Sequence, residues 1–458
     1  MTLQTALLKQ AKTLTTPQWL KVGLYVTWGA SALMVVSAIA GIQIQRNGLK
    51  AVAEKSIPNV FMAQRLKTAM TDIDSIVANQ LVEDSLTMSR VDQENYNNRR
   101  GELSERIVLA ARNISLGDAE QKPLESFVLN YSNYMAQAER ARFAKERGDR
   151  VAMLAAYRQA AQILDNKLLP TADQFARVNE VALESSYQLA QMTSAWWLGA
   201  IAAFGLVLIV SLIVLQLFLI RRTRRMLNPL LAAATVTSVL LLAHTFGLMS
   251  FSQTTLQVVK DDLYDSIRTM RLGRVQLYQA NSAQSRYLLD RARSTQHQTA
   301  FDQHTAQMLK LPGLTTANTV IDALQAGKST RGMTGYFAKS LQAARTPEER
   351  QALDKMMQYY AQYLQLHQQI RQLAESGQTQ AAIALSTGRN QGQSYWTFDR
   401  LRDANEAARN IYNDTFEQTR SQALRSLEGF EVKAIITLAA IALLILFGLR
   451  PRLREYLI

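Results

Sequence analysis

Residues 195–225 read AWWLGAIAAFGLVLIVSLIVLQLFLIRRTRR. The part from 195 to 220 has no charged side chain, and four arginines follow it directly. A helix of roughly 20 apolar residues crosses the ~30 Å hydrocarbon core of a bilayer. Basic residues are retained on the cytoplasmic side of a membrane. The stretch therefore predicts a membrane-spanning helix that ends at the cytoplasmic face.

Three more stretches, 22–42, 230–251 and 434–449, also lack Asp, Glu, Lys and Arg. The last is short, but a snorkelling Lys433 can extend it. We predict four spans that separate two polar blocks. The predicted division is a cytoplasmic N-terminus at 1–21, spans at 22–44, 195–220, 229–251 and 433–449, extracytoplasmic blocks at 45–194 and 252–432, a basic cytoplasmic loop at 221–228 and a cytoplasmic tail at 450–458.

The basic charge of the chain is concentrated beside these spans. The formal net charge is +14, and residues 1–21 contain three lysines and no acidic residue. This pattern is typical of cytoplasmic flanks, so we interpret it as a topology signal and not as a nucleic-acid-binding surface. The sequence predicts a multi-pass protein of the bacterial inner (cytoplasmic) membrane, with both termini in the cytoplasm and no nucleic-acid partner.

Both polar blocks have helical patterns. In the first block, apolar residues recur at three- and four-residue spacing between Leu66 and Leu81, which is typical of a bundle helix. We expect Pro123 to open a helix, Gly148 to turn the chain, and Pro170 to kink the helix before the second span. In the second block, Thr346-Pro347-Glu348-Glu349 predicts a capped helix start.

Each block leaves and re-enters the same membrane face, which requires an even number of antiparallel helices. Four helices fit the length of each block. The predicted fold class is therefore all-α, a membrane protein with four transmembrane helices and two extracytoplasmic antiparallel four-helix bundles.

The two blocks also look like an internal repeat. Tyr131, Tyr134 and Gly148 match Tyr360, Tyr363 and Gly377 at one constant offset, and Ser56-Ile57 matches Ser266-Ile267 at a smaller one. The difference places extra residues in the second block, and we expect them around 327–335. Chance similarity between helices rich in Ala, Gln and Leu remains an alternative.

Residues typical of catalysis are few. The chain has no cysteine and four histidines, which are scattered. His244 lies inside the third span, where it either has a functional role or bonds to a neighbouring helix. We therefore predict no cofactor, no metal site and no enzymatic activity.

Arg268, Arg271 and Arg274 are three residues apart in the first helix of the second block, so they share one side of that helix. Guanidinium groups clustered in this way suit carboxylate recognition. We predict a ligand-binding site here. The alternative is a solvated helix face in which these arginines pair with the nearby acidic residues Asp261, Asp262 and Asp265.

The basic loop after the second span forms a second candidate site. Arg221, Arg222, Arg224 and Arg225 would contact a cytoplasmic partner, or else anionic lipid headgroups. Small residues at four-residue spacing in the spans, such as Gly199 and Ala203, allow close helix packing. They would support a compact span bundle or a homodimer.

The arrangement of span, helical bundle and span resembles the sensory half of bacterial chemoreceptors. The four-span layout, with the segment YQANSAQSRYLLD at residues 278–290, is similar more narrowly to GlnX-type signalling membrane proteins. That resemblance implies an extracytoplasmic solute-binding protein and a cytoplasmic kinase as partners. Nine residues follow Leu449, so we expect any signalling output in a separate chain.

These observations predict a non-enzymatic signal relay. It would sense a small molecule, or a solute-binding protein loaded with its ligand, and pass that state to a cytoplasmic partner. Two other classes stay open. A structural or assembly subunit of an envelope complex would keep a fixed partner and show no ligand response. A transporter is disfavoured because the spans carry few ionisable groups and no broken helices.

Overall fold

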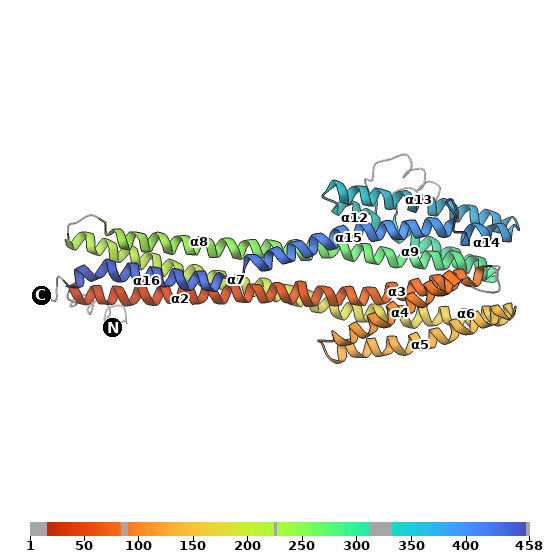
Figure 1. Ribbon diagram of the computed structural model, residues 1–458, viewed down its shortest axis with the longest axis horizontal. Helices are drawn as coiled ribbons and strands as arrows, with labels where there is room; N and C mark the ends of the chain where they lie inside the picture. Colours follow the sequence, from red (N-terminus) through yellow and green to blue (C-terminus); the bar gives the residue numbers. More distant parts are fainter. Residues whose placement is uncertain (1–15, 84–89, 224–226, 311–331, 455–458) are drawn as a thin grey trace, which may run out of the picture. The chain divides into compact units, whose positions relative to one another are not determined.

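Long helices dominate the computed structural model, which describes residues 16–83, 90–223, 227–310 and 332–454 (Figure 1). Within these ranges the regular elements are all helical, and one isolated antiparallel bridge joins Lys310 to Thr334. The all-α fold class is therefore confirmed.

In the described parts of the chain, four helices are long and apolar enough to cross a membrane. The helices that contain the apolar stretches are α2 (Thr16–Lys50), α7 (Leu169–Thr223), α8 (Pro229–Gln257) and α16 (Phe430–Arg454). They lie side by side in Figure 1 and share one core, in which Met34, Ile201 and Ile441 are fully buried. Large apolar side chains such as Tyr25, Leu206 and Leu240 remain exposed, as expected for a surface that faces lipid.

Contacts divide the chain into two compact units. One contains α2, α8, α16 and the part of α7 from Ser185 onward, and combines Met1–Glu54, Ser185–Val258 and Thr419–Ile458. The other, which we call the outer unit, combines Lys55–Glu184 with Val259–Gln418. The outer unit thus contains helices from both polar blocks.

The first block forms α3 (Ile57–Val82), α4 (Arg90–Arg112), α5 (Asp118–Glu146), α6 (Arg150–Ile163) and the start of α7. Gly148, with a φ of 72°, turns the chain between α5 and α6 as predicted. Pro123 does not open a helix, because α5 begins earlier, at Asp118. The Glu120 carboxylate accepts hydrogen bonds from the backbone amides of Ser115 and Leu116. These bonds stabilise the earlier start of the helix. A π-helical segment, η2 (Leu164–Leu168), comes just before Pro170.

The second block forms α9 (Asp265–Leu289), η4 (Arg291–Arg293), α10 (Ser294–Met308), α12 (Tyr336–Ala343), α13 (Pro347–Glu375), α14 (Thr379–Thr387) and α15 (Ser394–Ser426). The capped helix start at Thr346 is confirmed. The Thr346 hydroxyl accepts a hydrogen bond from the Glu349 backbone amide, and the Glu349 carboxylate accepts one from the Thr346 backbone amide. Most of the irregular stretch expected around 327–335 lies outside the described residues.

Two more π-helical segments precede the first helix of each block, η1 (Ala51–Ser56) before α3 and η3 (Val258–Tyr264) before α9. Both fall in sequence where one compact unit gives way to the other. Their similar positions agree with the offset noted above, but the internal repeat itself stays a prediction.

The two blocks pack together through α3 and α9. One apolar cluster contains Met70 and Ile73 of the first block together with Leu288 and Ile370 of the second. Polar side chains add direct bonds across the contact: Asn281 donates to the Ser75 hydroxyl at 2.6 Å, and Ser285 bonds to Asn79. This α3–α9 contact positions the candidate sites that follow.

Candidate functional site

The three arginines predicted to bind a ligand lie on α9 and differ in their surroundings. Arg268 pairs with Glu180 at 2.8 Å, and Arg274 pairs with Glu406 at 3.0 Å. Arg271 is 4% exposed, and no hydrogen bond or ion pair of its guanidinium occurs among the described residues. Because Arg271 and Arg274 are buried, a solvated helix face does not describe them.

Arg271 lies in a group of basic side chains. Its guanidinium carbon is 4.7 Å from the centre of the Phe61 ring. Burial lowers the pKa of Arg271 well below its ordinary value, and the charges of its neighbours lower it further. These neighbours are Arg65, Arg409, Arg274 and Arg106. We call these five arginines the arginine cluster.

Carboxylates offset part of the charge of the arginine cluster: Glu102 pairs with Arg106 at 3.2 Å, and the charge of Asp72 raises the pKa of Arg274. Glu406 is the carboxylate shared by Arg274 and Arg409, at 3.0 and 3.2 Å. Burial lowers the pKa of Arg409, and the charge of Arg274 lowers it further. Burial also lowers the pKa of Arg65, and the charge of Arg106 lowers it further. The electrostatic arrangement therefore favours an anion close to Arg271.

Four helices build this cluster. Phe61 and Arg65 lie one turn apart on α3, Arg106 comes from α4, and Arg409 comes from α15. The sequence pattern on α9 identified Arg271 and Arg274. It could not identify Phe61, Arg106 or Arg409, because helices distant in sequence bring them to the site.

A polar network lies farther along α3 and α9. The Asp74 carboxylate, 1% exposed, accepts from Arg286 at 2.9 Å, Tyr134 at 3.0 Å and Tyr157 at 3.3 Å. Arg286 also pairs with Asp165 at 3.0 Å. Burial raises the pKa of Asp165, and Arg286 partly offsets this. Arg286 thus joins the second block to two carboxylates of the first.

Two histidines of the outer unit, His367 and His304, bond to neighbouring side chains. His367 stacks on Phe301, with ring centres 3.4 Å apart, and its ring nitrogens bond to Gln284 and Gln298. His304 bonds to Gln276 at 2.7 Å. In the described part of the chain, no three His, Asp or Glu residues are placed to hold a metal ion.

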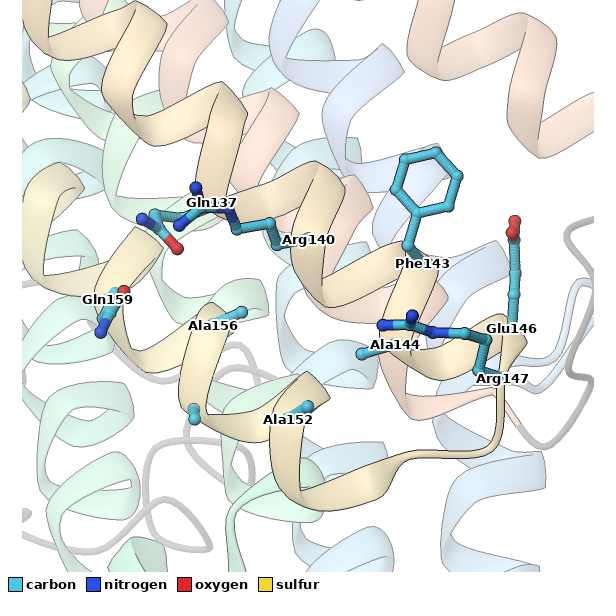
Figure 2. Close-up of a pocket in the computed structure, with 10 residues that line it drawn as sticks. Gln137, Arg140, Phe143, Ala144, Glu146, Arg147, Ala152, Ala156 and Gln159 are labelled. Atoms are coloured by element: carbon cyan, nitrogen blue, oxygen red, sulfur yellow. The ribbon is translucent and has the colours of Figure 1, made fainter.

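A surface hollow of about 630 Å³ lies between α5 and α6 (Figure 2). Ala144, Ala152 and Ala156 contribute to its lining, while Phe143 points away from α6 and is 62% exposed. The charged residues at this hollow are all exposed. It is an open groove without the buried, uncompensated charge that marks the arginine cluster.

Only part of the basic loop that follows α7 can be placed. Arg221 is exposed near the end of α7, and Arg222 belongs to the same helix. Arg224 and Arg225 lie outside the described residues. Contact of this loop with a partner or with lipid stays a prediction.

One family model matches the chain: a model described as an actinobacterial sensor domain matches residues 48–188. No curated protein and no solved structure matches it. The matched region includes α3 to α6, and with them Phe61, Arg65, Arg106 and Asp74. Together with the four helices able to cross a membrane, the match supports a multi-pass sensory or signalling membrane protein. A sensor domain also fits a role without catalysis.

Proposed function

We propose that this chain is a non-enzymatic transmembrane sensor whose outer unit binds a small carboxylate at the arginine cluster. One observation carries the proposal: Arg271 is buried without a counter-charge among the described residues. Leaving a buried charge unpaired is unfavourable by roughly 3–5 kcal/mol. A carboxylate would remove much of this penalty and would accept paired hydrogen bonds from the guanidinium.

The same anion would link several helices. Arg271 lies on α9, and Phe61 and Arg65 lie on α3. Each of these helices belongs to a longer continuous one, Pro229–Leu289 and Pro17–Val82, which also includes an apolar stretch. An anion that binds one packing of α3 and α9 more tightly than another would shift the population toward that packing. The continuous helices would carry this shift to the spans.

For topology and partners, we propose that both polar blocks face outward and both termini face the cytoplasm of a bacterial cell. A separate cytoplasmic protein, such as a kinase, would read the state of the spans through the basic loop that includes Arg221. A solute-binding protein would deliver ligand outside, and a homodimer would double the signalling surface. The positive charge beside the spans and the resemblance to GlnX-type proteins support this arrangement.

A thermal-shift titration tests the binding step. The full chain, purified in detergent, is titrated with malonate against sodium chloride at matched ionic strength. We expect malonate to raise the midpoint of unfolding of the wild type and to have no effect on Arg271→Met. Arg350→Met, a change at an exposed residue of α13, is the control and should respond like the wild type. An identical malonate response in Arg271→Met would refute the proposal.

A further inference from the structure

Glu406 of α15 places a native carboxylate inside the arginine cluster. Its Oε2 atom accepts a hydrogen bond from Arg274 of α9 at 3.0 Å, and its Oε1 atom accepts one from Arg409 at 3.2 Å. Both guanidinium groups belong to the cluster around Arg271. A side chain of the protein therefore already occupies cations that a bound anion would use.

Glu406 is reachable from solvent, unlike the two arginines that it contacts. Its side chain is 46% exposed, whereas those of Arg274 and Arg409 are 9% and 16% exposed. Burial raises the pKa of Glu406, but Arg274 and Arg409 lower it overall, so the carboxylate is ionised at pH 7. An ion pair with a half-exposed partner is weak. Glu406 can therefore leave while the two buried guanidinium groups stay in place.

The helix that carries Glu406 continues toward an apolar stretch. In the outer unit α15 runs alongside α9 (Figure 1), and the buried Asn405 donates to the Met270 carbonyl of α9 at 3.5 Å. α15 and α9 belong to longer helices, Ser394–Pro451 and Pro229–Leu289, and each of these includes an apolar stretch. The pair between Arg274 and Glu406 therefore joins two of the four long helices that are able to cross a membrane.

We propose that Glu406 is a built-in competitor for the anion site: its carboxylate occupies Arg274 and Arg409 in the ligand-free protein, and a bound carboxylate displaces it. The inference rests on the proposed carboxylate binding at the arginine cluster and adds its regulation. Competition lowers the apparent affinity, because the ligand binds only the fraction of molecules in which Glu406 has left. Displacement also breaks the pair between α9 and α15, so binding acts directly on the helix that continues into α16.

Isothermal titration calorimetry with malonate, on the full chain in detergent, tests the competition. Glu406→Gln removes the competing carboxylate, so we expect it to bind malonate roughly tenfold more tightly than the wild type. Asp414→Asn is the matched control, because it removes the same charge from an exposed residue about two turns farther along α15. It should bind malonate like the wild type. Equal or weaker binding of malonate by Glu406→Gln would overturn the proposal.

A second variant, Glu406→Asp, separates displacement from repulsion between charges. Aspartate keeps the negative charge, but its shorter side chain should lose at least one of the two bonds to Arg274 and Arg409. We therefore expect Glu406→Asp to bind malonate more tightly than the wild type and less tightly than Glu406→Gln. Wild-type affinity in Glu406→Asp would show that repulsion alone weakens binding, and it would contradict displacement.

Adding Arg271→Met to Glu406→Gln locates the tighter binding. The gain in affinity should disappear in this double variant, and a gain that persists would overturn the assignment to the arginine cluster. The outcomes also show which idea fails. If the wild type binds malonate and the Glu406 variants bind it no more tightly, the competition fails and the proposed carboxylate site stands. If neither the wild type nor Glu406→Gln binds malonate, the carboxylate site fails and the competition fails with it.

Discussion

Replacing Arg271 with Met should make the ligand-free protein more stable. Methionine keeps most of the length of the side chain and removes the charge. An uncompensated buried charge is unfavourable by roughly 3–5 kcal/mol. The contact with Phe61 that would be lost contributes about 1–2 kcal/mol. The expected net gain is about 2 kcal/mol, which corresponds to a rise of about 4 °C in the unfolding midpoint for a domain of a few hundred residues.

Unfolding of the full chain by nanoscale fluorimetry, in chloride buffer without carboxylates, measures this gain. Malonate should then reverse the order of stability. At a concentration one hundred times its Kd, a ligand stabilises the folded state by about 2.7 kcal/mol, and only the wild type would receive this contribution. A variant that is less stable than the wild type in chloride would refute the reasoning, because it would show that Arg271 already has a favourable partner.

Two further predictions concern the buried polar groups of the outer unit. Arg286→Met should destabilise the protein by roughly 3–5 kcal/mol, because it leaves Asp74 buried without its cation. In a double-mutant cycle measured by chemical unfolding, adding Asp74→Asn should restore part of this stability. If the stability changes of the two single variants simply add, the two residues do not form a direct pair. Burial lowers the pKa values of His297 and His304 to about 4 and that of His367 to about 3, from an ordinary value of 6.5. The unfolded state therefore binds more protons between these values, so stability should fall as the pH drops from 6.5 toward 4, by up to about 1.4 kcal/mol per pH unit for each histidine. His367→Asn should reduce this slope in unfolding curves recorded over that pH range, and an unchanged slope would contradict the prediction.

The four helices able to cross a membrane could be predicted from the sequence because their signal is local. A run of apolar residues is sufficient to identify such a helix, and the cap at Thr346 is likewise contained within four residues. Pro123 shows the limit of local rules. Proline favours the first turn of a helix, but the backbone bonds to Glu120 allow the helix to begin at Asp118.

The candidate site was predictable only in part. The three-residue spacing on α9 placed Arg271 and Arg274 together, but it could not show that Arg271 is buried and unpaired. That state depends on Phe61 and Arg65 of α3 and on Arg409 of α15, which are far away in the sequence. The contact between Arg286 and Asp74 joins residues 212 positions apart, and no periodicity within a helix predicts such a pair.

The central claim is that an anion at Arg271 changes the packing of the spans. The chain has no native cysteine, so spin labels can be attached at Arg221→Cys and Arg450→Cys, two exposed positions near the ends of α7 and α16. Pulsed electron–electron resonance in nanodiscs then measures the distance between the labels with and without malonate. The account predicts a malonate-dependent shift in the distance distribution that disappears when Arg271→Met is added. An identical distribution under both conditions, in a protein shown to bind malonate, would contradict it.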